Sequence, residues 1–387
     1  MSAPAFRQFD IAGFLREHWQ KSPLLIRNPW RDWANPLAPE ELAGLACEPE
    51  VESRLVRHDA RDEWALKHGP LSSADFAQMG EAPWTLLVQA VDHHVPEVAA
   101  LIEPFRFIPD WRIDDVMVSY ASDGGGVGPH YDQYDVFLVQ GLGRRRWRVG
   151  PRCDENTPLL PHDSLRLLAE FEASEEWVLE PGDMLYLPPG FAHDGVAVGE
   201  DCMTYSIGFR APSRAELVSG WTDHVLDLLE EDDRYGDPGL RPLANPGEIL
   251  ADALDAMQRM VIDALADPTQ FSRWVGGFVT EPKSDAVDWS PDDPLSPDDL
   301  RTQLARVGEL ERNPASRFAF VRSGADAVIL FVDGMAYDCE GETAVFAERL
   351  CRSPSFAIDL DWAGSHRTTG LIHELASGGC VAIVTGD

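Results

Sequence analysis

The sequence predicts a protein of mainly β structure with added helices: a jelly-roll-like barrel, a helical region and a small α+β unit. Three observations lead to this prediction. Short β-rich runs alternate with Gly/Pro turns between residues 84 and 210, apolar residues follow a helical spacing over 250–265, and a hairpin signal lies at 327–339. Regularly spaced short strands without a long helix between them favour an antiparallel barrel or jelly roll.

The N-terminal elements predict a short amphipathic helix over 9–20, a strand at 23–27 and a helix over 39–46 that begins with proline. The barrel strands are expected in six β-rich runs: WTLLVQAV (84–91), DDVMVSYA (114–121), YDVFLVQG (134–141), RRWRVG (145–150), EEWVLEPGDMLYLPPG (175–190) and CMTYSIGFR (202–210).

Beyond residue 211 the pattern becomes helical. Ser213 can cap a helix that runs to about Glu231, and a further helix is predicted over 268–278. Between them, one apolar helix face is formed by Leu250, Leu254, Met257, Val261 and Leu265. We expect this face to pack on other helices or on a second subunit, and we predict a homodimer.

The last part of the chain predicts a small α+β unit. Leu300, Leu304 and Val307 mark a helix, and Asp333-Gly334 is the turn of a hairpin. Two helical stretches and a last strand follow, an order compatible with a winged helix. The predicted domains are a catalytic barrel (1–212), a helical dimerisation region (213–280), a Pro- and Asp-rich linker (281–297) and a winged-helix-like domain (298–387).

Charge excludes several classes of partner. The 387 residues include 32 basic and 66 acidic ones, a net charge of −34, and only three of the basic residues are lysines. Such a surface repels phosphate backbones and anionic lipids and attracts a basic partner. Residues 296–387 carry eight arginines and fourteen acids, so we expect no direct DNA binding by the last domain.

Six scattered cysteines without a C-x-x-C pair fit a reducing compartment. Neither a signal peptide nor an apolar run of roughly 20 residues is present, so we expect a cytoplasmic protein with no membrane contact.

His130 and Asp132 form the pattern H-x-D in the segment GGGVGPHYDQYDVFLVQG. On a strand these two side chains would point to the same face and could bind one ion. A third ligand would complete the two-histidine-one-carboxylate triad of non-haem Fe(II) oxygenases, which leaves positions open for reactants. His193, in PGDMLYLPPGFAHDG, is the best-placed third ligand.

H-x-D alone is a weak signal, but its combination with PGD-x-L-Y-x-PPG-x-x-H is much more specific. We interpret His93, His94 and His162 as ordinary histidines. Gly124–Gly126 is interpreted as a flexible loop at the mouth of the site, because neither GK[ST] nor a helix follows it.

These motifs resemble those of the JmjC-type oxygenases of the cupin superfamily, and in particular the bacterial ribosomal oxygenases that hydroxylate an arginine of a large-subunit ribosomal protein. The similar segments cover nearly the whole chain: FLREHWQKSPLLIR, PDWRIDDVMVSY, GGGVGPHYDQYDVFLVQGLGRRRWRVG, EPGDMLYLPPGFAHDG and YSIGFRAPSRAELVSG. The resemblance implies a double-stranded β-helix, a helical dimerisation region and a C-terminal winged helix.

The resemblance also implies the reaction and its site. Fe(II) would be bound by His130, Asp132 and His193, with 2-oxoglutarate and O2 as co-substrates. A basic residue fifteen positions after the first histidine binds the far carboxylate of 2-oxoglutarate in the family, and here it is Arg145. Arg145 shares a strand face with Trp147, and an arginine offers a bidentate fork for a carboxylate.

Other site residues are expected around this centre. A hydroxyl would complete the co-substrate site, with Ser119, Ser122 and Ser206 as candidates, and Ala121 stands where a hydroxyl was expected. A basic ribosomal protein needs acidic and aromatic groups at the mouth. The candidates that flank the metal ligands are Asp123, Tyr131, Tyr134, Asp135 and Asp194.

Three alternatives remain open at this stage. The chain could be a JmjC oxygenase acting on another protein or on a small molecule, because the triad does not determine the substrate. It could be a non-catalytic cupin regulator with a winged helix, although the charge of the last domain argues against this. A metal-storage cupin would need neither an intact triad nor Arg145.

Overall fold

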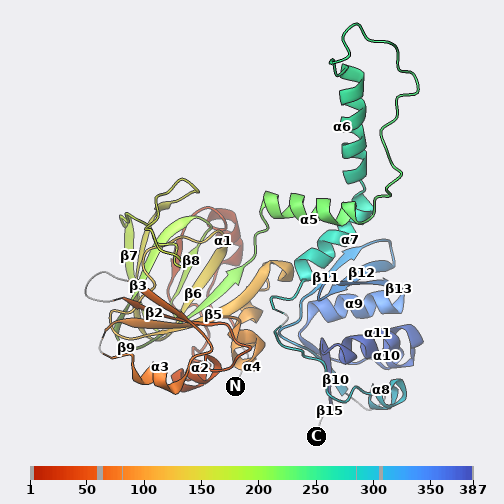
Figure 1. The fold of residues 1–387 in the computed structure, drawn as a ribbon. Helices are drawn as coiled ribbons and strands as arrows, with labels where there is room; N and C mark the ends of the chain where they lie inside the picture. Colours follow the sequence, from red (N-terminus) through yellow and green to blue (C-terminus); the bar gives the residue numbers. More distant parts are fainter. Residues whose placement is uncertain (1–3, 59–63, 81, 285, 305–307, 386–387) are drawn as a thin grey trace.

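Two bodies lie side by side in the structure, a computed structural model that describes residues 4–58, 64–80, 82–284, 286–304 and 308–385 (Figure 1). Strands from the N-terminal half build a barrel, and a smaller α/β unit from the C-terminal third lies beside it. Helices between the two bodies connect them in sequence, and one of these helices projects far from both.

The N-terminal elements contribute helices and four strands of the barrel sheet. They are α1 (Ile11–Glu17), β1 (Leu24–Ile26), α2 (Pro39–Leu45), β2 (Ser53–His58), β3 (Trp64–His68), α3 (Ser73–Ala77), β4 (Trp84–Val88) and α4 (Pro96–Ala99). The predictions of α1, β1, α2 and β4 are confirmed. The sequence analysis missed β2 and β3.

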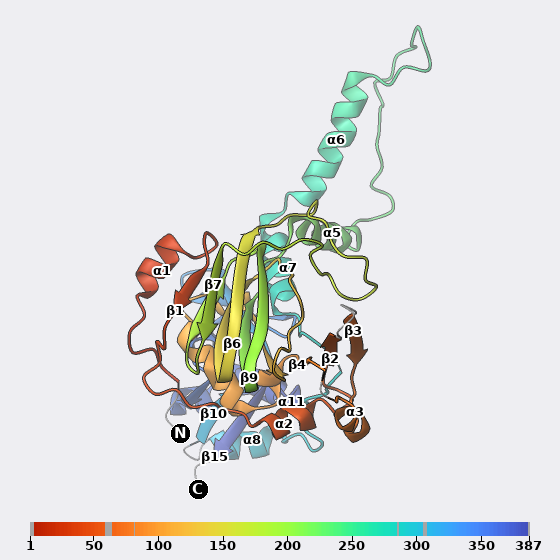
Figure 2. The same cartoon turned by 90° about the vertical axis from the view of Figure 1, so that its left-hand side faces the viewer.

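The barrel is built from one antiparallel sheet with two long strands at its centre. Its remaining strands are β5 (Ile113–Ala121), β6 (Asp135–Arg152), β7 (Glu175–Leu179), β8 (Met184–Leu187) and β9 (Phe191–Phe209), in the order β1-β8-β6-β9-β5-β4-β2-β3 with β7 beside β6. The first half of β6 pairs with β8 and the second half with β7, while β9 follows β6 along most of its length (Figure 2). The predicted jelly-roll class is therefore confirmed.

Strand β6 corrects one prediction. The runs 134–141 and 145–150 were expected as separate strands, but they form one strand with irregular pairing to β9 between Gln140 and Arg144. Gly143 has a φ of +57°, a conformation that glycine adopts without steric cost. A bulge at this point bends the strand without ending it.

Successive side chains of the barrel strands point alternately to the outer core and to the barrel interior. Phe137 of β6 packs with Phe14, Phe105 and Tyr186 on the outer side, where the N-terminal helices cover the sheet. Side chains of opposite parity face the barrel interior, among them Leu138. Because of this alternation, the outer side of the sheet is packed with side chains, whereas the interior contains a cavity.

Three helices follow the barrel: α5 (Arg214–Leu226), α6 (Ala251–Leu265) and α7 (Pro268–Thr280). Ser213 caps α5 as predicted, since its hydroxyl accepts a hydrogen bond from the Glu216 N–H. Helix α6 projects from the body with the preceding loop alongside it (Figures 1 and 2). It contains no buried residue, and Leu254, Val261 and Ile262 are more than half exposed.

The C-terminal unit contains two three-stranded sheets and four helices. Its elements are α8 (Pro297–Leu304), β10 (Gly308–Arg312), β11 (Phe318–Arg322), β12 (Ala327–Val332), β13 (Met335–Glu340), α9 (Glu342–Arg352), β14 (Ser355–Ala357), α10 (Leu360–Gly364), α11 (His366–Ser377) and β15 (Val381–Thr385). The hairpin around Asp333-Gly334 is confirmed. Val307 lies outside the described residues. Within the described part of the chain, we find no helix of sufficient length and apolarity for a membrane span.

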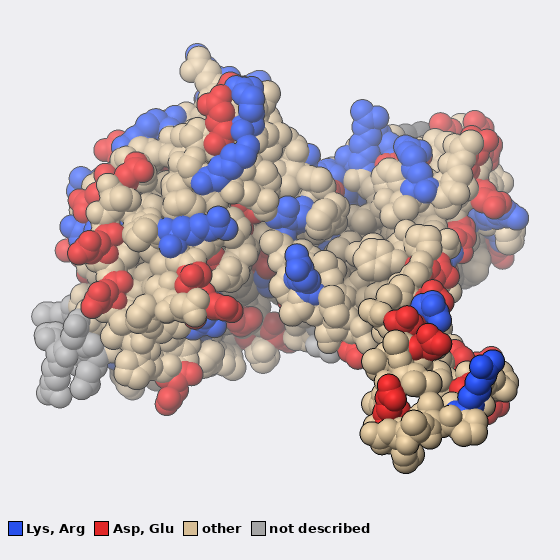
Figure 3. All heavy atoms as spheres, turned by 90° about the horizontal axis from the view of Figure 1, so that it is seen from above, with Lys and Arg blue, Asp and Glu red and all other residues tan. Residues whose placement is uncertain are grey.

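Charged groups join the barrel to the C-terminal unit. Arg106 of the barrel binds Asp110 and the carbonyl oxygen of Cys351, and Arg312 lies 3.6 Å from the same aspartate. The outer surface seen from above carries basic and acidic side chains on both bodies rather than a field of one sign (Figure 3). The contacts of Arg106 and Arg312 described above hold the C-terminal unit against residues 106–114, directly beside the start of β5.

Candidate active site

A cavity of about 540 Å³ lies inside the barrel and is lined by the inner faces of β5, β6 and β9. The three predicted metal ligands, Arg145 and two of the three candidate serines, Ser119 and Ser206, line it together. Residues separated by more than seventy positions in the sequence therefore share one cavity, in which a bound small molecule would be partly shielded from water.

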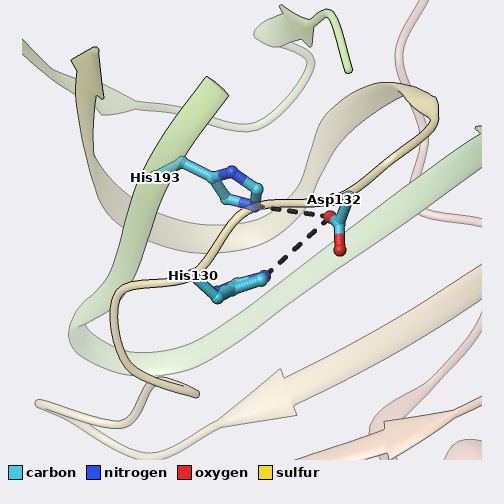
Figure 4. Close-up of side chains that lie close together, drawn as sticks. All are labelled: His130, Asp132 and His193. Carbon is cyan, nitrogen blue, oxygen red and sulfur yellow. Dashed lines mark ion pairs between the residues drawn. The ribbon is translucent and has the colours of Figure 1, made fainter. Parts of the chain in front are cut away.

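His130, Asp132 and His193 point toward one another (Figure 4). The Asp132 Oδ2 atom lies 3.6 Å from Nε2 of His193 and 3.9 Å from Nε2 of His130. One potential ligand atom from each of the three side chains lies within 4.8 Å of the others. This separation permits all three side chains to contact a common ion, and the two-histidine-one-carboxylate set is the one used by non-haem iron oxygenases.

The local structure around His130 differs from the expectation. His130 and Asp132 lie in a loop before β6, and not on a regular strand. His130 makes an isolated bridge with His193 of β9, in which each N–H donates to the other residue's carbonyl oxygen. The Gly190 N–H donates to the Asp132 carbonyl oxygen at 2.7 Å, so backbone hydrogen bonds orient the H-x-D segment without a strand.

Hydrogen bonds also determine which imidazole nitrogens are available. Nδ1 of His130 lies 2.8 Å from the Gly128 carbonyl oxygen, and Nδ1 of His193 lies 2.9 Å from that of Phe191. A carbonyl only accepts, so both Nδ1 atoms must carry hydrogen, and in the neutral ring it is then Nε2 that offers a lone pair to a metal. Burial, with a contribution from His130, lowers the pKa of His193 to about 4 and keeps its ring neutral near pH 7, as a metal ligand must be.

Arg145 has an unused donor inside the cavity. It is 3% exposed, and its Nε donates to the Cys202 Sγ at 3.5 Å. Its Nη2 is buried with no hydrogen-bond partner among the described atoms. Leaving a charged donor buried and unpaired is costly, so this guanidinium fits an anionic ligand. Trp147 packs beside it, with its ring centre 5.6 Å from the Arg145 Cζ.

The side chains of β6 around Arg145 alternate between the two faces of the strand, as predicted. Arg145 and Trp147 point inward, whereas Arg144 is exposed and Arg148 pairs with Asp194 outside the cavity. Gly195 opposite Trp147 makes room for the indole, because a Cβ there would lie 2.5 Å from the ring. Any side chain at residue 195 would therefore displace Trp147 from its place between Arg145 and the metal ligands.

Hydroxyl groups line the same wall. Ser119 of β5 and Ser206 of β9 both face the cavity, and Thr204 lies opposite Ser119 in the sheet. Ser122 points elsewhere, since its hydroxyl contacts the backbone of Trp84. Thr204 was missed by the sequence analysis, although alternation along β9 places it on the face of Ser206. Ala121 pairs with Cys202 in a small buried cluster.

Two of the five predicted substrate residues, Tyr131 and Tyr134, line the cavity. The other three lie elsewhere, which corrects the expectation. Asp135 is fully buried on the outer side of β6, where it accepts hydrogen bonds from Gln20, Arg112 and Tyr186.

Asp194 is buried on the far side of β9 from His193 and pairs with Arg148 at 2.6 Å. Asp123 accepts a hydrogen bond from the Gly199 N–H in a turn. Each of these three acids already has its own partners, so none of them is available to a substrate in the cavity.

Two acids that the sequence analysis did not select lie at the cavity wall. Asp114 and Asp115 begin β5 in the segment PDWRIDDVMVSY and line the cavity with Met117. Asp115 is 3% exposed, and burial raises its pKa although Lys283 opposes the shift. The signal that could have revealed them is the pair of adjacent acids at the start of a barrel strand.

The histidines interpreted as ordinary lie outside the triad. His93 is mostly buried, which lowers its pKa to about 4. His94 lies beside Trp289, with ring centres 5.7 Å apart, and His162 contacts the Trp64 carbonyl oxygen. Among the described residues, His130, Asp132 and His193 form the group of potential ligands close enough to hold a metal.

Two parts of the chain match known protein families. Residues 100–217 match the JmjC domain, and residues 263–381 match the ROXA-like winged helix. The second match begins inside the predicted helical region, and the domain boundaries given above remain predictions.

Two relatives match most of the chain. It is 46% identical over 297 residues to the ribosomal protein uL16 3-hydroxylase of Escherichia coli, covering 77% of this chain and 78% of that protein. It is 38% identical over 312 residues to a probable ribosomal oxygenase of Haemophilus influenzae, covering 76% and 74%.

Solved structures show the same similarity in three dimensions. The X-ray structure of E. coli ycfD superposes with a TM-score of 0.88 at 38% identity and covers 98% of this chain and all of that one. The complex of YcfD with cobalt and 2-oxoglutarate has a TM-score of 0.86 at 37% identity, with 98% and 99% covered.

Proposed function

The chain belongs to the JmjC-domain ribosomal oxygenases, and on this premise we propose that it is an Fe(II)- and 2-oxoglutarate-dependent dioxygenase that hydroxylates an arginine of a large-subunit ribosomal protein. The observation that carries the proposal is the cavity itself. It combines three side chains able to bind one ion with a buried, unpaired guanidinium on the same wall. A metal and a 2-oxo dicarboxylate are the ligands that these two features fit.

His130, Asp132 and His193 would hold the metal. Iron(II) bound there supplies the activation of O2 that is coupled to oxidation of 2-oxoglutarate, chemistry that side chains alone do not provide. The protein's own part is to present two Nε2 atoms and one carboxylate oxygen on one side of the ion. Three protein ligands would leave coordination positions for co-substrate and O2.

Arg145 would bind the far carboxylate of 2-oxoglutarate through Nη2. Ser119, Thr204 and Ser206 lie on the neighbouring strands and offer hydroxyl donors to the same carboxylate or to the substrate. Thr204 already donates to Gln140 at 3.2 Å, so Ser119 and Ser206 are the better candidates.

The substrate guanidinium would bind at the wall formed by Asp115, Met117 and Tyr134. Asp115 is a buried carboxylate, and the aromatic and apolar groups cover the stem of an arginine side chain. Tyr131 lies at the loop that leads out of the cavity, where its hydroxyl donates to the Asp154 carbonyl oxygen.

The direct test is mass spectrometry of ribosomal proteins from cells with and without the gene. We expect one arginine of a large-subunit protein to carry an added oxygen atom only in cells that have the gene. Re-expression of the Asp132→Ala variant should leave that arginine unmodified. An identical mass for every ribosomal protein in both strains would contradict the proposed substrate.

We also propose that the chain has the four-part organisation given by the sequence analysis and forms a homodimer through α6. An apolar helix face that projects into water is unfavourable for an isolated protomer. A cytoplasmic location accompanies the proposed ribosomal substrate.

For the oligomeric state, we expect light scattering at micromolar concentration to give about twice the protomer mass of 42.9 kDa. Val261→Glu should shift the protein toward the monomer, because it places a charge in the apolar face. Asp255→Glu on the same helix is the matched control and should not. A wild-type mass of about one protomer would rule out the dimer.

A further inference from the structure

Lys283 reaches the candidate active site from outside the barrel. It follows α7 in the segment that leads to the C-terminal unit, and it lines the cavity. Its Nζ lies 2.6 Å from Oδ2 of Asp114 and 3.1 Å from Oδ2 of Asp115. The other two lysines of the chain, Lys21 and Lys67, are exposed.

A distortion in β5 lets both aspartates contact one lysine. Adjacent side chains of a regular strand point to opposite faces. The pairing of β5 with β9 shifts register between Ile113 and Val116, so the two acids lie in an irregular stretch. A bulge of this kind re-aims a side chain next to a functional site, and here it places two carboxylates at one corner of the cavity.

The two oxygens of the Asp115 carboxylate have different surroundings. Oδ2 accepts hydrogen bonds from the Gln89 Nε2 at 2.7 Å and the Ala90 N–H at 2.8 Å, in addition to its ion pair with Lys283. Among the described residues, no hydrogen bond ends on Oδ1. This oxygen lies near Gly208 of β9, where a Cβ would be 3.8 Å from it, and Gly208 also lines the cavity.

The charges around Asp115 come from several elements. Burial raises its pKa, Asp114 adds to the shift and Lys283 opposes it. Asp114 is held by Lys283 and by Arg317 of the C-terminal unit, with Arg210 at 3.9 Å. These cations outweigh its burial and lower its pKa.

Several further groups belong to this environment, including Glu52 and Arg54 at the start of β2, which line the same cavity. Burial and Asp115 raise the pKa of Asp92 to about 8, so Asp92 is mostly neutral at pH 7. Burial lowers the pKa of His93, which is also neutral there. Tyr134 faces Asp115 from the loop that carries the metal ligands. Lys283 is therefore the cation in direct contact with Asp115 among the described residues.

We propose that Lys283 is a positioning residue of the substrate site: it holds Asp115 by Oδ2, so that Oδ1 faces the cavity and accepts a hydrogen bond from the substrate's guanidinium. The proposal rests on the arginine substrate proposed above. It means that the segment following α7 completes a site otherwise built by the barrel. The Lys283 ammonium and the substrate cation then use different oxygens of one carboxylate and do not compete.

The test is peptide affinity as a function of pH. The probe is a synthetic arginine-containing peptide of ribosomal protein uL16, titrated by calorimetry into the full chain loaded with Co(II) and 2-oxoglutarate. Without Lys283 the pKa of Asp115 rises further, and each pH unit below that pKa costs about tenfold in binding to the ionised form. We expect Lys283→Met to weaken binding several-fold at pH 8 and roughly tenfold or more at pH 6.

Two variants separate positioning from a general structural effect. Lys283→Arg keeps the charge and should retain wild-type affinity at both pH values. Lys67→Met removes a lysine that pairs with Asp75 outside the cavity and should behave as wild type. If Lys283→Met does not fold, Lys283→Gln takes its place, because it keeps a donor without the charge.

Each outcome decides the matter. The proposal would be overturned if Lys283→Met lost the same affinity at pH 6 and pH 8, kept its affinity, or bound the peptide more tightly. It would also be overturned if Lys283→Arg did not restore the affinity. A different result is that Lys283→Met shows the expected pH-dependent loss of peptide affinity, but the Fe(II) enzyme does not hydroxylate the bound peptide. That result would contradict the proposed function and would still support the role of Lys283. Absence of peptide binding by the wild-type chain would overturn both.

Discussion

Replacement of His193 by alanine is expected to abolish 2-oxoglutarate turnover while the barrel stays folded. His193 contributes one of three candidate ligand atoms, and its Nδ1 is already committed to the Phe191 carbonyl oxygen. Loss of a group that only orients a ligand costs roughly 10–100-fold in metal affinity, and loss of the ligand itself should cost more. Succinate formation and Co(II) titration measure the two effects separately. His130→Ala and Asp132→Ala should behave in the same way.

His366→Ala is the matched control for these variants. His366 is an exposed histidine at the start of α11 and lies outside the cavity. Its variant should keep wild-type turnover and Co(II) affinity. Wild-type turnover by His193→Ala, with an unchanged circular dichroism spectrum, would show that His193 is not the distal ligand.

Arg145→Ala is expected to raise the Michaelis constant for 2-oxoglutarate far more than that for the protein substrate. Nη2 of Arg145 is buried without a partner, and a carboxylate would satisfy it. A hydrogen bond to a charged group contributes roughly 1.5–3 kcal/mol, which corresponds to about 10–150-fold in affinity. Because this contact is distant from the metal ligands, the loss should appear mainly in co-substrate binding. Steady-state kinetics with each substrate varied in turn measures it.

Arg144→Ala and Arg146→Ala provide the comparison on the same strand. Both side chains have the opposite parity to Arg145, and neither lines the cavity. We expect their Michaelis constants for 2-oxoglutarate to stay within about twofold of wild type, because neither side chain reaches the co-substrate. A large effect at Arg144 or Arg146 with none at Arg145 would show that another residue binds the co-substrate.

Local patterns predicted many of the elements. Alternation of apolar residues indicated β5, Ser213 marked the start of α5, and Asp333-Gly334 marked the β12–β13 turn. These signals depend on residues close in sequence, so they can be recognised without knowledge of the fold. The long strands β6 and β9 were underestimated, because bulges interrupt the alternation without ending the hydrogen-bonded ladder.

Proximity in sequence was a poor guide to the substrate wall. Asp135 and Asp194 are each adjacent to residues that line the cavity, yet both point away from it. Neighbouring side chains of a strand point to opposite faces. A residue directly next to a cavity-lining residue therefore points away from the cavity. Asp115 lies on the cavity wall instead, although it is fifteen positions from the nearest metal ligand in the sequence.

By itself, the sequence determined the jelly-roll class, the residue types and spacing of the metal triad, and the strand parity that turns Arg145 inward. Each depends on a short pattern or on the two-residue period of a strand. Only the tertiary structure decided which acids face the cavity and that Lys283 reaches Asp115 from beyond α7. A contact between segments about 170 residues apart depends on how the C-terminal unit packs against the barrel, and no local pattern encodes that packing.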